Sequence, residues 1–374
     1  MESPLPALED RDIATHKGAS VDRQGRTPTD DTYGAKKMKT HPCWVVTYLM
    51  LGGPWVWLLF AQSASGQLLE IPHTADPQSS SGTEGRILLR APWGSAPGEF
   101  GKTDEASRPG PMDFAVVEDD LYVLDTVNAR VQVFGLEGNF KTAIPIRTKT
   151  ADFLCVGPDG EVAVLDAFCR RQLSVFSLGG KLRRSMKLPE AIGLPSAVFT
   201  DGRCTWVEDR HNRVLEISAV DDKEDTPARV INILPGRPMA AGRGTMHALR
   251  KDERDVLIHL AAKESEETVT VRFPHRLLSI VTLEADATGK VCVAAVCENQ
   301  ATEGQPQRRI VATTIERSTM AARVVSMPDA YITDHYRKLW LLESGDLVQM
   351  QTTKEEVRFL RWTPEPVQRK EVSQ

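Results

Sequence analysis

Residues 114–140 of this 374-residue chain read FAVVEDDLYVLDTVNARVQVFGLEGNF. Three short apolar runs, FAVV, LYVLD and RVQVF, are separated by an acidic turn and by the turn TVNA, and a glycine turn follows the third run. Short apolar or alternating runs bounded by turn residues are typical of β-strands. The stretch therefore predicts a small antiparallel sheet.

Weaker copies of this unit follow along the chain. The letters VLD at 123–125 return at 164–166, and TWVE at 205–208 and LWLLE at 339–343 are looser copies. A repeat of about 40–45 residues with several short strands in each copy is the sequence signature of a β-propeller. On this spacing the units are expected at 112–145, 150–188, 193–236, 245–282, 284–318 and 327–352.

The predicted fold is all-β, a six-bladed β-propeller over residues 86–362, with five or seven blades as the alternatives. A single small sheet cannot bury both of its faces, so such sheets stack side by side around a channel. Strand-like segments at 86–90 and 357–362 flank the repeats. We expect one or both segments to complete a shared blade and to cover an exposed sheet edge.

The first 65 residues are expected to lie outside the propeller. Residues 1–37 are polar and lack apolar periodicity, which indicates a disordered extension or a mispredicted start. In residues 38–65, the apolar run 44–61 follows a group of lysines and precedes small residues, which is the order of a secretory signal peptide. The run is also just long enough for an uncleaved membrane anchor.

The body of the protein is therefore predicted to be extracytoplasmic. It is either secreted or periplasmic, or it is anchored with the propeller outside, and then it meets the membrane only through residues 44–61. Residues 66–85 are predicted to be a flexible linker and residues 363–374 a polar tail.

Composition sets further limits on function. The chain is 41% apolar and 26% charged, as expected for a globular protein, and its formal net charge is -5. Its arginines occur in pairs rather than in long basic runs, so no nucleic-acid partner is expected. Apart from Cys43, which precedes the apolar run, the cysteines lack a metal-binding spacing, and Cys155 and Cys292 are expected to be buried free thiols.

The first unit resembles an NHL repeat. It has the lead GSAPGEFG and then the pattern D-x-x-N-x-R-V-x-V-F followed by glycine. The matching positions are Asp125, Asn128 and Arg130 in the first unit, Asp166 in the second, and Glu208, His211 and Arg213 in the third. The resemblance implies a propeller that acts as a binding platform. A minority of such propellers are enzymes, so the resemblance also allows an enzymatic function. Those enzymes are calcium-containing lactone or ester hydrolases and a metal-dependent lyase with histidine ligands.

The repeated polar residues are predicted to be structural. Asp and Asn in a tight turn hydrogen-bond the neighbouring backbone, and Arg130 on the next strand can pair with Asp125 across the hairpin. An active site is needed once, whereas this motif returns along the chain. We therefore assign Asp125, Asn128, Arg130, Asp166, Glu208 and Arg213 to the repeat motif and not to chemistry.

A second set of polar residues stands just before the inner strands. These are Asp113, Asp152, Ser196 and Asp329. Three carboxylates around one end of a channel would repel one another unless a cation lay among them, and Ca²⁺ takes about six to eight oxygen ligands. Asp113, Asp152 and Asp329 are thus candidate calcium ligands. The alternative is turn chemistry, in which each side chain bonds the local backbone.

Three functions follow from these observations. The first is a non-enzymatic extracytoplasmic platform for a protein, peptide or glycan. The alternatives are a calcium-dependent hydrolase of lactonase or esterase type that works in the channel, and a sensor domain on a membrane anchor. The chain has no G-x-S-x-G element and no phosphate-binding G-x-x-x-x-G-K-[ST] loop, so the first function is preferred and no catalytic residue is assigned.

Overall fold

The computed structural model describes residues 67–71, 85–104, 109–211, 213–220, 224–239, 244–262, 265–286, 288–299 and 307–367. The predicted extension 1–37 and the predicted signal or anchor 38–65 lie outside these ranges. Within the described ranges, no helix has the length and apolar character needed to cross a membrane.

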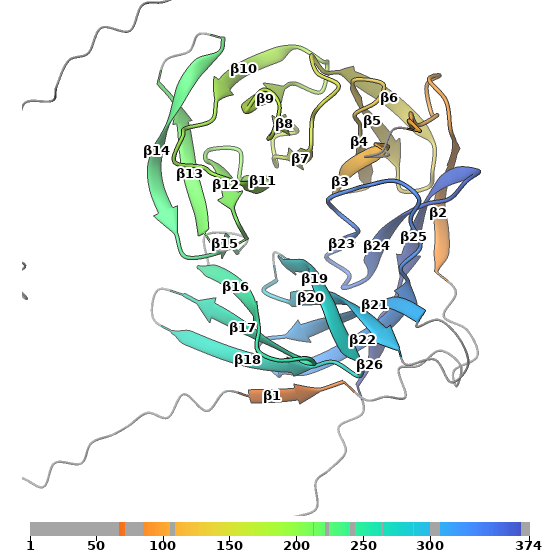
Figure 1. The fold of residues 1–374 in the computed structure, drawn as a ribbon, viewed down its shortest axis with the longest axis vertical. Coiled ribbons are helices and arrows are strands. Elements are labelled where there is room, and N and C mark those ends of the chain that lie inside the picture. Colours follow the sequence, from red (N-terminus) through yellow and green to blue (C-terminus); the bar gives the residue numbers. More distant parts are fainter. Residues whose placement is uncertain are drawn as a thin grey trace, which may run out of the picture. The chain divides into compact units, whose positions relative to one another are not determined.

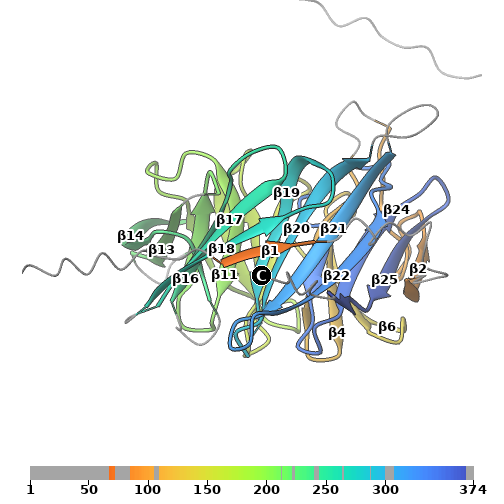
Figure 2. The same ribbon diagram turned by 90° about the horizontal axis from the view of Figure 1, so that it is seen from below.

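The described residues form 26 strands and no helix, so the all-β prediction is confirmed. Strand pairing divides them into antiparallel units in which strands that follow one another in sequence are neighbours. Figure 1 shows these units arranged as a ring, with β3, β7, β11, β19 and β23 nearest the centre. In the side view of Figure 2, tilted strands span the thickness of the ring. The molecule is a β-propeller.

The first units follow the predicted spacing closely. One sheet contains β3 (Pro111–Val117), β4 (Asp120–Asp125), β5 (Arg130–Gly135) and β6 (Phe140–Pro145). The next unit contains β7 (Phe153–Val156), β8 (Val162–Asp166), β9 (Gln172–Phe176) and β10 (Leu182–Lys187). The third contains β11 (Pro195–Thr200), β12 (Thr205–Asp209), β13 (Arg213–Ala219) and β14 (Thr226–Leu234).

The later units depart from the predicted boundaries. One contains β15 (Arg237–Pro238), β16 (Thr245–Arg250), β17 (Asp255–Ala261) and β18 (Glu266–Arg272). The next contains β19 (Arg276–Ala285), β20 (Val291–Asn299), β21 (Gln307–Glu316) and β22 (Ala321–Pro328). The predicted boundary between 282 and 284 is wrong because it falls inside β19.

The last sheet joins the two ends of the ring. It contains β23 (Leu339–Leu341), β24 (Leu347–Thr352) and β25 (Glu356–Trp362), and its outer strand is β2 (Arg86–Pro92). β2 pairs antiparallel with β25 from Arg86 opposite Arg361 to Pro92 opposite Glu356. The prediction that terminal segments complete one shared sheet is confirmed.

Two further terminal segments extend outer sheet edges. β1 (Gln67–Glu70) pairs parallel with β18, and β26 (Glu365–Pro366) pairs antiparallel with β22. The predicted linker and polar tail are therefore partly wrong. The physical reason on the N-terminal side is burial, because Leu69 and Ile71 pack into the core beside β18.

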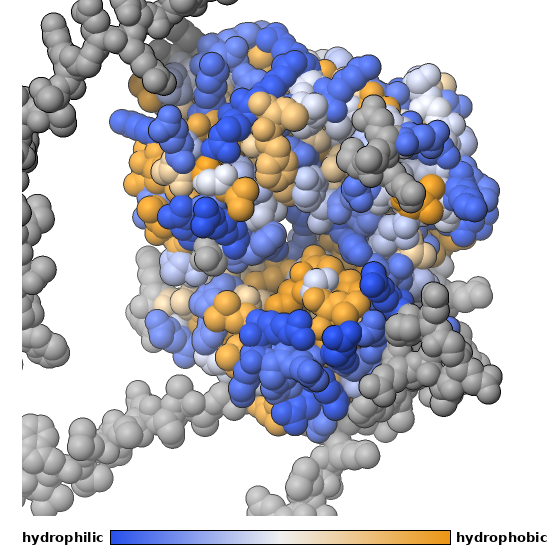
Figure 3. Space-filling model, in the orientation of Figure 1, coloured by the Kyte–Doolittle hydropathy of each residue, from blue (hydrophilic) through white to orange (hydrophobic). Residues whose placement is uncertain are grey.

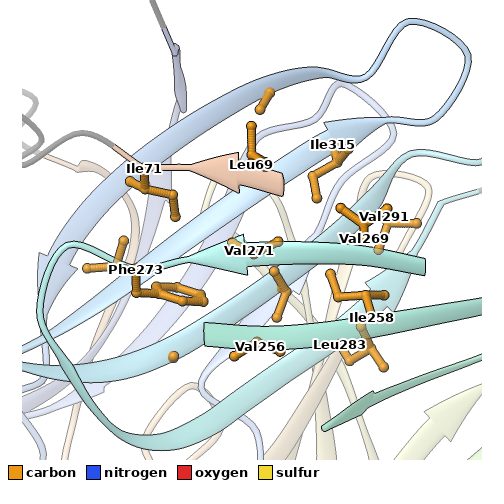
Figure 4. Packing of buried hydrophobic residues seen from close by; sticks show 14 of the residues in the cluster. Leu69, Ile71, Val256, Ile258, Val269, Val271, Phe273, Leu283, Val291 and Ile315 are labelled. Carbon is orange, nitrogen blue, oxygen red and sulfur yellow. The ribbon is translucent and has the colours of Figure 1, made fainter. Parts of the chain in front are cut away.

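The apolar core lies between neighbouring sheets. Figure 4 shows Ile258 of β17 beside Leu283 of β19, and Val269 of β18 beside Val291 of β20, in one such layer. On the other side of the ring, Phe114 meets Phe359 edge to face with ring centroids 5.3 Å apart. Full burial of one such side chain contributes about 1.5–3 kcal/mol, so packing between the sheets holds the ring together.

Two of the units are also joined by hydrogen bonds at their outer strands. β10 and β14 pair in parallel, but only Met186 opposite Thr226 and Lys187 opposite Pro227 are in register. The two units thus form one eight-stranded sheet that is joined through this short contact.

Candidate functional site

Arg337 is the centre of a buried ionic network. It lies in the segment between β22 and β23, and its Nε donates to Oδ1 of Asp113 on β3 at 2.8 Å. Its Nη1 donates to Oε1 of Glu284 on β19, and its guanidinium lies 4.7 Å from the centroid of the Trp340 ring. One cation therefore links the inner strands of two different sheets.

Burial and charge act in opposite directions within this network. Burial raises the pKa of Asp113, while the Arg337 charge and the backbone N–H groups of Leu154 and Phe114 act against that rise. Burial alone would lower the pKa of Arg337, but the Asp113 and Glu284 charges raise it above its ordinary value. Arg337 therefore stays protonated, and the carboxylates of Asp113 and Glu284 both balance its positive charge.

Asp152 is a second buried acidic residue, and it directly precedes β7. Its Oδ2 accepts a hydrogen bond from the backbone N–H of Ala167 at 2.8 Å, and the nearby Tyr336 hydroxyl acts to lower its pKa. Burial raises the pKa of Asp152 to about 6, and the nearby charge of Asp166 adds to this rise. Ionising Asp152 is thus costly in the unliganded protein.

Phe153, the residue after Asp152, belongs to a cluster of three aromatic rings. The Tyr336 ring lies 4.5 Å from the Phe153 ring and 6.3 Å from the Phe168 ring, measured between centroids. Phe153 is buried, whereas Phe168 is 50% exposed and Tyr336 is 45% exposed. We call Asp152, Phe153, Phe168 and Tyr336 the aromatic–acid site.

The segment 329–338 is held in place by backbone contacts with the sheet that begins at β3. The N–H of Tyr336 donates to the carbonyl of Met112 at 2.7 Å, and Asp334 forms a parallel bridge with Pro109. A Cβ on Gly110 would lie only 2.9 Å from the Thr333 side chain, so the glycine permits this close approach. These contacts fix the positions of both Tyr336 and Arg337.

The three predicted calcium ligands each have protein partners. Asp113 accepts from Arg337, Asp152 accepts from Ala167, and Asp329 accepts from the Lys338 ammonium at 2.6 Å. Within the described ranges, no group of three or more His, Cys, Asp or Glu side chains could hold a metal ion. Two of the three carboxylates are paired with a cation of the protein itself, which does not fit a calcium site.

Addition of saturating calcium is expected to leave the melting temperature unchanged, because a ligand stabilises a protein only when it binds the folded state. Thermal unfolding followed by circular dichroism, with calcium and with a chelator, measures this. A calcium-dependent rise of several degrees that is lost in Asp152→Asn would instead support the predicted ring of ligands.

A second ion pair joins the sheets of β12 and β15. Arg237 binds both carboxylate oxygens of Glu208, at 2.6 Å through Nε and at 3.0 Å through Nη2. The Ser196 hydroxyl donates to Glu208 at 2.8 Å, and His211 Nδ1 lies 3.2 Å from the same oxygen. Despite burial, hydrogen bonds and the Arg237 charge lower the pKa of Glu208 to about 2.

This geometry corrects the alignment of the third repeat. Asp209, not Glu208, is the structural counterpart of Asp125, because Asp209 lies opposite Pro195 as Asp125 lies opposite Pro111. Asp209 also pairs with Arg213 at 2.6 Å. The assignment of Glu208 to the repeat motif is therefore wrong by one residue.

The motif residues of the first unit fix the turn that leads out of β2. Asp125 Oδ2 accepts from Asn128 at 2.9 Å and from Arg130 at 2.8 Å. Arg130 in turn donates to the carbonyls of Ser95, Ala96 and Glu99.

In the second unit, Asp166 accepts from the Thr148 hydroxyl at 2.8 Å and from the Arg170 N–H at 2.8 Å.

The described cysteines are all free thiols. Cys155, Cys292 and Cys297 are buried, Cys204 is half-buried and Cys169 is exposed. Burial raises the pKa of Cys155 and Cys292 far above the ordinary value, so these thiols are inert.

The space-filling view shows where ligands could approach. Figure 3 shows a hollow at the centre of the ring, with apolar surface beside it over β19 and β20. A separate polar pocket of about 140 Å³ lies against the β7–β10 unit and is lined by Asp166, Gln172, Ser185 and Asp225 among others.

Comparisons with known proteins identify no family for this chain. No family model matches the chain, and no curated protein matches it. Similar solved structures include the hydrazine synthase of Kuenenia stuttgartiensis, with 13% identity over 68% of this chain and 76% of that chain and a TM-score of 0.43. A streptogramin B lyase shares 11% identity over 76% of this chain and 96% of its own, with a TM-score of 0.38. The Cps50 (Swd1) β-propeller domain of Myceliophteria thermophila shares 10% identity over 70% and 98%, with a TM-score of 0.37.

Proposed function

We propose that this protein is a non-enzymatic, NHL-like propeller of six blades that binds a protein or peptide partner outside the cytoplasm. Its aromatic–acid site would receive a basic side chain of that partner. The observation that supports this proposal is the position of the Asp152 carboxyl group near Tyr336, whose ring, like the neighbouring ring of Phe168, is about half-exposed.

The chemistry of the aromatic–acid site suits a lysine or arginine. A cation within about 6 Å of an aromatic face is attracted by the ring, and more strongly when water is displaced. The same cation would pair with Asp152, whose ionisation burial makes costly. Binding would therefore remove an electrostatic cost that the free protein carries.

The rest of the centre supports a rigid platform. Asp113 and Glu284 are engaged by Arg337, and Glu208 is engaged by Arg237, so these ion pairs fix the inner strands. Propellers place variable loops at the ends of such a frame, which suits recognition of a partner.

The binding function can be tested by selection from a random peptide library displayed on phage. We expect enriched peptides to contain lysine or arginine, and we expect Phe168→Ser to lower their affinity at least tenfold. Leu178→Ser is the matched control, because Leu178 is also about half-exposed but lies in the turn at the other end of β9. Enrichment of peptides without basic residues, or glycan binding alone on an array, would contradict the proposal.

The affinity for a basic peptide should rise as the pH rises from 5 to 7. Asp152 ionises near pH 6 in the folded protein and near pH 4 in an unfolded chain, so its contribution to stability is lost as the pH rises through about 6. Binding of a cation needs the carboxylate, so affinity for a selected peptide should be roughly tenfold lower at pH 5 than at pH 7. Fluorescence anisotropy measures this, and Asp152→Asn should remove the dependence while keeping the acceptor for Ala167.

We also propose that residues 38–65 direct the propeller out of the cytoplasm. The support is the order of lysines, apolar run and small residues in the sequence. The mass of the mature protein distinguishes a cleaved signal from a retained anchor, which is the form that a membrane-bound sensor would need.

A further inference from the structure

A groove lies beside the outer strands β10 and β14. It has a volume of about 430 Å³ and lies between the β7–β10 and β11–β14 units. The residues that line it come from β10, the turn before β12, β13 and β14. They are Arg183, Arg184, Met186, Arg203, Cys204, Thr205, Glu216, Ile217, Ser218, Ala219 and Ile231.

The groove carries an excess of positive charge. Three arginines, Arg183, Arg184 and Arg203, line it together with one carboxylate, Glu216. Arg184 makes a long ion pair of 3.6 Å with Glu161, and its Nε is buried without a hydrogen-bond partner.

The local backbone explains how adjacent arginines reach one groove. The pairing of β10 with β9 shifts register between Leu182 and Arg184. A β-bulge of this kind changes the direction of a side chain relative to a regular strand. Arg183 and Arg184 therefore both line the groove, although neighbours on a regular strand point to opposite faces.

Within the part of the chain that the structure describes, the outer edge of β10 pairs with β14 only at Met186 and Lys187, whereas the outer edges of β18, β22 and β25 are covered by β1, β26 and β2. An uncovered edge offers N–H and C=O groups to an extended chain, a mode of peptide recognition known as strand addition. Ile231 of β14, which is 48% exposed, also lines the groove and would contact an apolar side chain of the ligand.

We propose that the groove binds an extended acidic segment of a protein partner. The segment would add to the edge of β10, and its carboxylates would pair with Arg183, Arg184 and Arg203. This inference rests on the proposed platform function, but it concerns a surface separate from the aromatic–acid site. Since the protein has a formal net charge of -5, an acidic ligand would need this local positive charge to bind.

The test uses a fluorescein-labelled peptide of alternating glutamate and valine and a matched peptide with glutamine in place of glutamate. We expect the acidic peptide to bind at least tenfold more tightly than the neutral one, and we expect higher salt to weaken it. The double variant Arg183→Gln with Arg203→Gln should lower its affinity at least tenfold. Arg170→Gln is the matched control, because Arg170 is exposed and lines the other pocket.

Hydrogen exchange provides a readout that needs no variant. Those amides of residues 182–185 that point away from β9 should gain protection when the acidic peptide binds, because they would donate ladder hydrogen bonds to it. Equal binding of both peptides, or no protection at 182–185, would overturn the inference. Tighter binding of a single-stranded DNA oligonucleotide that depends on the same arginines would also overturn it, in favour of a phosphate ligand.

Failure of this inference can be separated from failure of the proposed function. If Phe168→Ser abolishes binding of library-selected basic peptides while the groove variants leave acidic peptide binding unchanged, the platform stands and the groove assignment falls. If the acidic peptide binds through the arginines and no basic peptide is enriched, the result supports binding in the groove. It contradicts the proposal that the aromatic–acid site binds a basic side chain.

Discussion

Replacement of Arg337 with methionine is expected to lower the free energy of unfolding by about 3–5 kcal/mol. The change removes one cation and leaves the Asp113 and Glu284 carboxylates without their common partner. Asp113 is almost fully buried, so it cannot recover its lost interaction from water. Equilibrium unfolding in urea measures the loss as a lower midpoint at an unchanged slope.

Two comparisons identify the cause of this loss. In the triple variant with Asp113→Asn and Glu284→Gln, no carboxylate is left unpaired, and most of the stability should return. Arg147→Met is the matched surface change, because Arg147 pairs with Glu224 while both are well exposed, and it should cost less than about 1 kcal/mol. An Arg337→Met protein within 1 kcal/mol of the parent would show that the network does not stabilise the ring.

Removal of β2 is expected to abolish cooperative unfolding altogether. A chain that begins at residue 93 lacks the outer strand of the last sheet, so β25 exposes its edge and the core loses Leu88, Leu89 and Ala91. We expect loss of the near-ultraviolet circular dichroism signal and association on size-exclusion chromatography, because an exposed edge pairs with other chains.

The control for this experiment is a chain that begins at Gly85. It keeps β2 and loses only β1, so it should unfold cooperatively with a reduced midpoint. A synthetic peptide that covers residues 85–92 should partly restore the shorter chain when added in excess. Cooperative unfolding of the chain that begins at residue 93 without this peptide would mean that the ring does not need β2.

The first three units could be predicted from sequence because their turns carry specific residues. Asp125, Asn128 and Arg130 act within a few residues of one another, so their pattern is visible in the local sequence. Units without such turns could be located only by spacing. β19 begins at Arg276 in a sheet of longer strands, and the predicted boundary consequently fell inside it.

The slip from Asp209 to Glu208 has a similar origin. The two acids are adjacent, and the letters around them fit the repeat almost equally well. Strand register separates them, because one residue of shift moves a side chain to the other face of the sheet. Asp209 consequently serves its own unit through Arg213, while Glu208 binds Arg237 of the next unit.

Only part of the candidate site could be predicted from the sequence. The sequence predicts Asp113 and Asp152 to be polar residues ahead of inner strands, and the structure places Asp113 within β3, whereas no sequence pattern indicates Tyr336, Arg337 or Glu284. Arg337 and Asp113 are more than half of the chain apart in sequence, and nothing in either local pattern signals their contact. The strand β1 was missed for the same reason, since its partner β18 is distant along the chain.

The pairing of β2 with β25 has a consequence for biosynthesis. On the ribosome, β2 emerges long before β25 is made, so its hydrogen-bonding groups and the side chains of Leu88 and Leu89 have no partner until β25 has been synthesised. During that interval the nascent chain holds an unpaired strand that could join a neighbouring polypeptide. Premature termination anywhere before Trp362 would leave β2 without its full partner, and chaperones or proteases would encounter such truncated products as open rings.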